Sequence, residues 1–478
     1  MIAWMLRITG IVVAMDLLWA AYFITPFALG LLIVVPLFFW GAKKLKKEEP
    51  SIEASGWVLG RGMDIDNPER PVDTVVTLED KAIDLGLLCV GGPGSGKSIM
   101  AIGLLKYLCE QRNGGWTYWE GKGDLDIYQR VVACGAAPDR FFSSELTSSD
   151  SINVFAGSAE SVIDRLSRAL IASESEYYGN AQRSALRRVV PLLKALELPV
   201  VLRDLYVVLM VPEAAMYVLN LARERGVKSD VIESARQFFS IEDKERNAQI
   251  HGLLNRMDAF ATGQIAERLN AYEPTLDLVD AARRGLKVYL HLPYTQLARD
   301  IAIMLTEEIG TIATHRQLYD KNRVAWPQVF DDWGAFFYDN FGPITSRCRS
   351  AKMPVNFLFQ SRGQTDKVDG NRIFTTEITD NIGGLCIFRI NGQETAEWAA
   401  RQFGTFETRE VSHSTVHNGS NITTVEKPRV RGDQLKDMDQ GEAYVNCLVM
   451  GERGRVDNSH RPRSEEHTSE LQSHHDLV

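Results

Sequence analysis

The chain has 478 residues, of which 45% are hydrophobic and 24% are charged, and it carries a formal net charge of −9. These values describe an ordinary globular protein of one to three domains. The acidic balance argues against a surface that wraps duplex DNA, so any nucleic-acid contact must be local, in a lined channel or a pore loop. The six cysteines lie far apart without metal-type spacing, which indicates reduced thiols of a cytosolic domain.

The first 42 residues predict a membrane anchor. No charged residue occurs from Leu17 to Ala42, and this length is enough to span a bilayer of about 30 Å. The lysine-rich stretch KKLKK follows directly and marks the cytoplasmic side. A cleaved signal peptide is the competing interpretation, but neither a basic start nor a clear small-residue cleavage site supports it. The sequence leaves open whether residues 1–42 form one span or a tight two-helix hairpin.

Residues 87–100, LLCVGGPGSGKSIM, contain the Gly-x4-Gly-Lys-Ser pattern of a phosphate-binding loop. Glycines let successive backbone N–H groups surround a phosphate, the lysine reaches the outer phosphate oxygens, and the serine hydroxyl faces Mg²⁺. An apolar run before the loop predicts a buried strand, and the apolar spacing after it predicts a helix. This order favours a nucleotide site over a plain glycine-rich turn. The predicted binding residues are Gly91, Gly92, Gly94, Ser95, Gly96, Lys97, Ser98 and Ile99.

The segment WPQVFDDWG supplies the carboxylates that such a loop needs on a neighbouring strand. We expect Asp331 to hold Mg²⁺ through water, together with Ser98, and Asp332 to act as the catalytic base. The alternative is an acidic pair that merely starts a loop. Most translocating ATPases carry glutamate in the second position, and Asp332 is one methylene shorter. A displacement of the attacking water by about 1 Å can lower the rate by about 100-fold.

Further candidates surround the next predicted strand, VNFLFQ. Gln360 ends this strand, where its amide can contact the γ-phosphate. Arg347 and Arg349 precede it, and either can serve as an arginine finger in a neighbouring subunit's site; a solvated basic turn is the alternative. Lys122, within EGKGD, can approach a phosphate or nucleic acid, but a plain turn is favoured. The predicted catalytic residues are Lys97, Asp331, Asp332, Gln360 and Arg349.

Strand-like and helix-like segments alternate along the chain, which predicts an α/β fold with a mostly parallel central sheet. Residues 158–283 show long 3.6-residue periodicity and predict an all-α insertion domain. The predicted parts are an anchor at 1–42, a linker with a short β region at 43–70, a nucleotide-binding domain at 71–157 and 284–460, the insertion at 158–283, and a tail at 461–478. The tail resembles a translated adaptor sequence, so it is left out of the functional argument.

The order of these parts resembles the type IV coupling proteins of conjugative DNA transfer, the TraD/TraG-like branch of the FtsK/HerA superfamily. The likeness covers about residues 1–450, and its specific part adds the stretch DNIGGLCIFRI, ETAEW and FG between residues 380 and 404. It implies a RecA-like P-loop NTPase with an all-α domain, anchored in the bacterial inner membrane with the catalytic domain in the cytoplasm. It also implies a homohexamer that uses ATP and Mg²⁺ to drive relaxase-bound single-stranded DNA into a type IV secretion channel.

The resemblance assigns Gly96, Lys97 and Ser98 to the phosphates and Mg²⁺, Asp331 to the Walker B position and Gln360 to the strand-end glutamine. Two other functions stay open. One is a protein-secretion or channel-assembly ATPase of the same system, with a polypeptide as cargo. The other is a receptor that binds nucleotide, hydrolyses it weakly and docks a relaxase complex. A chromosome-partitioning translocase is disfavoured, because it normally carries a larger multi-span membrane region.

Overall fold

The computed structural model describes residues 56–63, 74–171, 175–338, 340–366, 378–413, 420–447 and 452–457, which belong to one compact unit, Gly56–Val478. The anchor predicted at 1–42 and the tail predicted at 461–478 lie outside these residues. Of the described helices, none is by itself long and apolar enough to cross a membrane. Within the described part of the chain, α7 (Leu202–Met210) and α8 (Pro212–Glu224) are the only helix pair that meets that test together, and the pair is bent by 112°.

The described chain contains an eleven-stranded sheet with the strand order β2-β1-β13-β12-β9-β3-β8-β7-β4-β6-β5. Neighbouring strands from β9 to β5 are all parallel, whereas β2, β1, β13 and β12 pair antiparallel. The prediction of an α/β fold with a mostly parallel sheet is therefore confirmed. The strands are β1 Gly56–Met63, β2 Thr74–Glu79, β3 Leu87–Val90, β4 Trp116–Glu120, β5 Arg140–Ser143, β6 Lys287–His291, β7 Gln328–Asp331, β8 Val355–Phe359, β9 Gly384–Phe388, β12 Glu442–Cys447 and β13 Glu452–Asp457.

The parallel strands are short apolar runs because helices cover both faces of the sheet. Every residue of β3, β4, β7, β8 and β9 is buried. Alternate residues of β3 enter different cores: Leu87 and Cys89 pack with α3 and α4, whereas Leu88 and Val90 pack with helices of the opposite face. The helices beside the sheet are α2 Asp80–Ile83, α3 Lys97–Glu110, α4 Leu125–Ala133, α13 Gln296–Tyr319, η1 Trp333–Ala335, α14 Phe341–Ser350, α15 Arg362–Asp366, α17 Gln393–Arg401 and α18 Gly432–Lys436.

Two segments extend this arrangement. β1 lies within residues 43–70, where the sequence predicted a linker with a short β region, and it pairs with β2. β10 (Thr405–His413) and β11 (Ser420–Pro428) form a separate two-stranded antiparallel hairpin.

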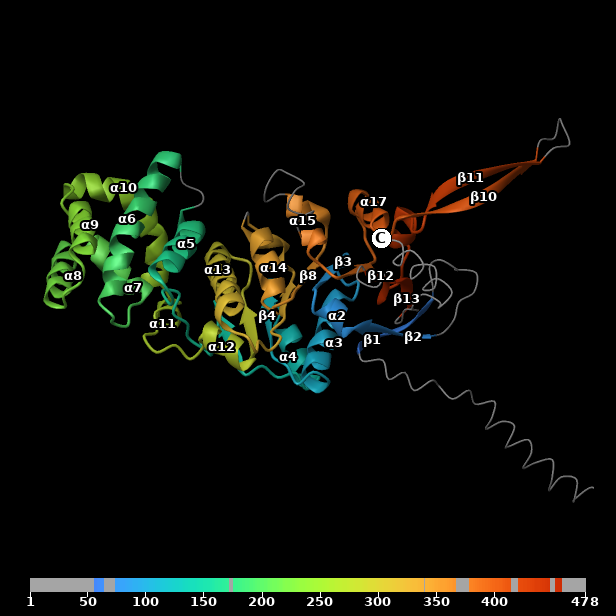
Figure 1. Cartoon of the computed structure of the whole chain (residues 1–478), viewed down its shortest axis with the longest axis horizontal. Helices are drawn as coiled ribbons and strands as arrows, with labels where there is room; N and C mark the ends of the chain where they lie inside the picture. The colour runs from blue at the N-terminus through green and yellow to red at the C-terminus, as the bar shows by residue number, and fades with distance from the viewer. Residues whose placement is uncertain are drawn as a thin grey trace, which may run out of the picture. The chain divides into compact units, whose positions relative to one another are not determined.

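The chain between β5 and β6 forms a helical region in which α6 packs against α5, α9 and α10 (Figure 1). One hydrophobic core continues from these helices to the sheet face beneath α13, and the limits predicted for a separate insertion domain stay a prediction. Besides α7 and α8, its helices are α5 Ala159–Leu170, α6 Glu176–Ala195, α9 Ser229–Phe239, α10 Asp243–Ala261, α11 Ala266–Leu269 and α12 Leu278–Arg284.

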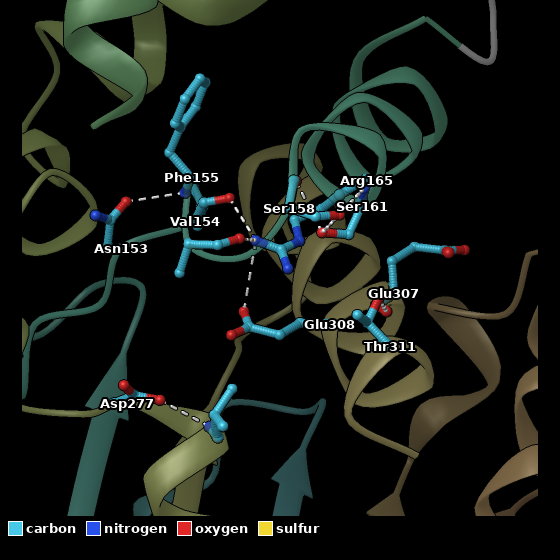
Figure 2. Close-up of polar contacts among 12 residues, drawn as sticks. Asn153, Val154, Phe155, Ser158, Ser161, Arg165, Asp277, Glu307, Glu308 and Thr311 are labelled. Carbon is cyan, nitrogen blue, oxygen red and sulfur yellow. Dashed lines mark hydrogen bonds and ion pairs between the residues drawn. The ribbon is translucent and has the colours of Figure 1, made fainter. Parts of the chain in front are cut away.

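Charged side chains, most of them buried, join this helical region to α13. Arg165 of α5 lies with its Nη1 3.8 Å from the Oε2 of Glu308 and donates to the carbonyl oxygen of Val154 at 2.6 Å (Figure 2). On the next residue of α13, the Oε1 of Glu307 lies 3.2 Å from the Nε of Arg168. The same oxygen accepts hydrogen bonds from Tyr338 and Asn340, which follow β7. We call these contacts the α5–α13 junction.

Candidate nucleotide-binding site

The loop between β3 and α3 depends on glycine at several positions. Gly94 and Gly96 have φ angles of 68° and 116°, in the left-handed region that favours glycine. A Cβ atom on Gly91 would lie 2.7 Å from the Ser95 hydroxyl oxygen. α3 begins at Lys97, so its first backbone N–H groups, which have no partner within the helix, face the loop. The loop and the helix start thus form a cradle for an anionic group.

Lys97 lies buried inside this cradle. Its Nζ donates to the carbonyl oxygens of Gly91 at 2.7 Å and Gly92 at 3.0 Å. Burial lowers the pKa of Lys97 below its ordinary value, and the charges of Asp332 and Asp331 oppose this shift. An anion bound in the loop would stabilise the charged form of this lysine.

Polar side chains meet at the ends of the parallel strands beside the loop. The strand register places Glu120 of β4 opposite Asp331 of β7, and Asp331 opposite Leu358 of β8. Asp332 follows β7 and Gln360 follows β8. This carboxyl edge, defined by Glu120, Asp331, Asp332 and Gln360, is where open α/β sheets bind ligands.

Asp331 is 2% exposed, and only one of its two carboxylate oxygens has a hydrogen-bond partner among the described residues. Its Oδ2 accepts a hydrogen bond of 2.5 Å from the Tyr118 hydroxyl, while its Oδ1 has no hydrogen-bond partner among the described residues. Burial raises the pKa of Asp331, and the neighbouring hydroxyl groups of Tyr118 and Ser98 and the charge of Lys97 oppose that shift. The structure therefore brings Ser98, Lys97 and Asp331 together, and their roles stay a prediction.

Asp332 adopts a backbone conformation that is uncommon for a residue with a side chain. Its φ and ψ angles are 50° and 34°. Such left-handed geometry costs about 1–3 kcal/mol and persists only where the surrounding structure enforces it. The Nε2 of Gln360 donates to the Oδ1 of Asp332 at 2.9 Å. Both predicted catalytic side chains are thus linked directly to each other.

A cavity of about 280 Å³ opens over this arrangement. It is lined on one side by six of the eight residues predicted to bind nucleotide: Gly94, Ser95, Gly96, Lys97, Ser98 and Ile99. Asp332 and Gln360 also line it, together with Lys122 and Asp124. The predicted residues Gly91 and Gly92 instead accept the hydrogen bonds from Lys97. Arg349 is exposed near the end of α14 and does not line the cavity of its own chain.

Sequence reasoning missed Glu120 and left Lys122 as part of a plain turn. Glu120 is 1% exposed and accepts hydrogen bonds of 2.8 Å from the backbone N–H groups of Lys122 and Gly123. Burial raises the pKa of Glu120 to about 7, against the effect of these hydrogen bonds. Glu120 thereby fixes the turn that carries Lys122 and Asp124 into the cavity lining. The signal in the sequence was a carboxylate at the end of the apolar run WTYWE.

A polar chain extends from Glu120 along the same edge. The Nε2 of His291 lies 3.9 Å from the Oε2 of Glu120, and its Nδ1 lies 2.9 Å from the Ser143 hydroxyl oxygen. Burial lowers the pKa of His291, which favours the neutral ring. Glu120, His291 and Ser143 do not line the cavity.

The residues present fit a magnesium-bound triphosphate. Mg²⁺ prefers oxygen ligands and usually combines one or two carboxylates with substrate phosphates and water. The Oδ1 of Asp331 and the hydroxyl of Ser95 are buried without hydrogen-bond partners in the described chain. No group of three or more His, Cys, Asp or Glu side chains in that part of the chain can hold a metal alone. A cation here would therefore depend on the phosphates for part of its coordination.

A family model and several solved structures resemble this chain. Residues 333–440 match the model of the family described as the TraM recognition site of TraD and TraG. No curated protein sequence matches the chain. The bacterial conjugative coupling protein TrwBdeltaN70 in its unbound form is 13% identical, with a TM-score of 0.57 over 84% of this chain and 88% of its own. The plasmid coupling protein TrwB with ADP and Mg²⁺ is also 13% identical, with a TM-score of 0.57 over 81% and 88%.

The fold and the site define an α/β protein with a phosphate-binding loop beside the carboxyl edge of its parallel strands. Within this class, the chain has the fold of TrwB and carries a region that matches the TraD and TraG family model. The resemblance to type IV coupling proteins predicted from the sequence is thereby confirmed.

Proposed function

We propose that the protein is an ATP hydrolase that couples relaxase-bound single-stranded DNA to a type IV secretion channel and drives conjugative transfer. The observation that carries the proposal is the meeting of the phosphate-binding loop with Asp331, Asp332 and Gln360 at the carboxyl edge. The central sheet is proposed to be RecA-like, because β8 lies between the loop strand β3 and the acidic strand β7.

Each residue of the site has a distinct proposed role. Lys97 compensates charge on the outer phosphates, and Ser98 and Asp331 hold Mg²⁺, Asp331 through water. The metal, when bound, would neutralise charge that develops on the phosphate oxygens. Asp332 orients and deprotonates the attacking water. Gln360, which donates to Asp332, reports the state of the γ-phosphate to the rest of the subunit.

The proposed assembly is a homohexamer, attached to the bacterial inner membrane by residues 1–42, with the catalytic domain in the cytoplasm. Arg349 is exposed on α14 and outside its own chain's cavity, which suits an arginine finger that enters a neighbouring subunit's site. The match over residues 333–440 supports a contact with components of the conjugation machinery.

One observation favours a second candidate, a nucleotide-binding receptor with weak hydrolysis. Asp332 stands where translocating ATPases usually carry glutamate, and Gln360 already occupies one of its oxygens. The shorter side chain then leaves the attacking water less well placed.

ATP hydrolysis by the purified full chain, measured with and without single-stranded DNA, tests the proposal. A coupling ATPase is expected to hydrolyse ATP and to be stimulated by the DNA. Indifference to DNA together with activation by a secretion-channel component would favour the protein-secretion ATPase instead. Hydrolysis that is absent in the wild type but restored in Asp332→Glu would identify the receptor.

A further inference from the structure

The segment that follows β7 is held at both ends. At its start, the Oδ1 of Asp332 accepts a hydrogen bond of 2.9 Å from Gln360. At its end, the hydroxyl of Tyr338 donates to the Oε1 of Glu307 at 2.9 Å. Residues 332–338, which we call the connecting segment, therefore lead from the phosphate cavity to the α5–α13 junction.

The interior of the connecting segment is tightly packed. Trp333 and Phe336 are buried and stack on each other, with ring centroids 4.7 Å apart. A Cβ atom on Gly334 would collide with the side chain of Gln364, and one on Gly121 would lie 2.8 Å from the ring of Phe336. Closely packed protein interiors have low compressibility and transmit strain. A displacement at one end of the segment is therefore expected to reach the other end.

Glu307 joins the connecting segment to α5 through a single oxygen atom. Its Oε1 accepts hydrogen bonds from Tyr338 at 2.9 Å and from the side chain of Asn340 at 2.7 Å. The Nε of Arg168, on α5, lies 3.2 Å from the same oxygen. Glu307 is only 9% exposed, so water has little access to replace a lost partner. A shift of Arg168 is therefore expected to move the carboxylate that Tyr338 and Asn340 bind.

We propose that Glu307 is a positioning residue for Asp332, and that its ion pair with Arg168 makes ATP turnover depend on the packing of α5. The inference rests on the proposed function of Asp332 as the catalytic base. Asp332 keeps its left-handed backbone conformation only while its surroundings enforce it, and Glu307 fixes the far end of those surroundings. A partner that binds the helical region and displaces α5 would thereby change the rate of hydrolysis without touching the phosphate cavity.

Steady-state ATP hydrolysis and equilibrium titration with ATP, both on the full chain, test the proposal. Tyr338→Phe removes one hydrogen bond to Glu307 and keeps the aromatic ring. Glu307→Gln keeps an oxygen that can accept hydrogen bonds and removes the ion pair with Arg168. We expect kcat to fall by about 10-fold in each variant, because a displacement of about 1 Å can lower the rate by about 100-fold. ATP affinity should stay unchanged, since neither residue lines the phosphate cavity.

Hydrogen–deuterium exchange supplies a second measurement that needs neither nucleotide nor turnover. Arg168→Met removes the partner of Glu307 on α5 and leaves the connecting segment itself unaltered. The backbone amides of residues 333–338 should then exchange faster than in the wild type, by about 10-fold. The amides of β9 should exchange as in the wild type. A role of Arg168 in stability alone would raise exchange in both places.

Glu233→Gln is the matched control. Glu233 also pairs with the Nε of an arginine, Arg236 at 2.7 Å, but this pair is exposed on α9. The variant should leave kcat, ATP affinity and the exchange of residues 333–338 unchanged. If Glu307→Gln does not fold, Tyr338→Phe carries the kinetic test.

Two results would overturn the proposal. In the first, Tyr338→Phe and a folded Glu307→Gln both keep the wild-type kcat. In the second, Arg168→Met leaves the exchange of residues 333–338 unchanged or raises it equally in β9. A wild type that binds ATP but does not hydrolyse it would instead refute the role of Asp332 as the base, and the exchange of Arg168→Met would still decide whether α5 controls the connecting segment.

Discussion

The carboxyl edge and the α5–α13 junction both contain buried carboxylates whose pKa is raised by burial. The two regions differ in whether the protein itself supplies every partner of these carboxylates. At the junction, Glu308 forms an ion pair with Arg165. Glu307 forms an ion pair with Arg168 and accepts hydrogen bonds from Tyr338 and Asn340. At the carboxyl edge, one oxygen of Asp331 lacks a hydrogen-bond partner among the described residues and the neighbouring cavity is open. A buried charged group whose partners all come from its own chain has a structural role. A buried charged group that lacks a hydrogen-bond partner beside a cavity indicates a binding site for a ligand.

The largest effect is expected from breaking the junction. Glu308→Ala removes the carboxylate that faces Arg165 and leaves a buried, uncompensated guanidinium group. Removing one partner of such a pair typically costs about 3–5 kcal/mol. The free energy of unfolding should fall by this amount. It is measured by urea denaturation, with unfolding monitored by circular dichroism.

The double variant Arg165→Met/Glu308→Leu is the control, because it removes both charges and keeps apolar volume. It should regain much of the stability lost in Glu308→Ala. A double variant less stable than Glu308→Ala would show that the ion pair is not the reason for the loss.

The second-largest effect is expected on the rate of ATP hydrolysis. Lys97→Ala removes the ammonium group that faces Asp332 and Asp331 across the loop. Loss of one donor that stabilises transition-state charge lowers kcat by about 100- to 1000-fold. Steady-state ATP hydrolysis should show this drop without a loss of stability comparable to that of Glu308→Ala. Hydrolysis at the wild-type rate would refute the assignment of the loop.

Asp332→Asn separates the chemistry of the edge from its structure. Asparagine tolerates the left-handed conformation of residue 332, and its carbonyl oxygen can still accept the hydrogen bond from Gln360. We expect hydrolysis to fall by about 100-fold through loss of the base, while ATP affinity measured by equilibrium titration stays unchanged. A variant that keeps the wild-type rate would show that another group activates the water.

The smallest effect is a pH dependence of stability from Glu120. Its pKa is about 7 in the folded chain against an ordinary value of 4.5. A carboxyl group with a raised pKa stabilises the fold fully below its unfolded pKa, and this contribution is lost as the pH rises through its folded pKa. Between pH 5 and pH 7 the loss from Glu120 amounts to about 2 kcal/mol.

Glu120→Gln removes the titrating carboxyl group. In this variant the free energy of unfolding should decrease less between pH 5 and pH 7 than it does in the wild type. Thermal unfolding at several pH values measures it. An unchanged slope in Glu120→Gln would assign the pH dependence to other buried carboxylates, such as Asp300, whose pKa burial raises to about 6.

Much of the carboxyl edge could be predicted from the sequence, because each strand and loop that forms it has a recognisable local sequence pattern. Apolar runs that end in Asp331 and Gln360 predicted β7 and β8, and the glycine pattern predicted the loop before Lys97. Parallel strands then place these ends at one edge. Glu120 was missed because a single acidic residue at the end of WTYWE has no distinctive spacing.

The junction was not predictable, since its partners lie far apart in the chain. Arg165 and Glu308 sit on helices whose periodicity indicates a buried face but not which charges meet there. The antiparallel strands β12 and β13 and the short edge strand β5 were missed as well. β12 pairs with β9, β13 with β1 and β5 with β6, and each of these partners is distant in sequence.

The most direct test of the account is ATP-dependent binding of Mn²⁺, as a substitute for Mg²⁺, followed by electron paramagnetic resonance. The central claim is that Ser98, Lys97 and Asp331 hold a metal-bound triphosphate. The account predicts that the wild type binds Mn²⁺ only with ATP and that Asp331→Asn weakens this binding by about 10- to 100-fold. Unchanged Mn²⁺ affinity in Asp331→Asn and in Lys97→Ala would contradict it.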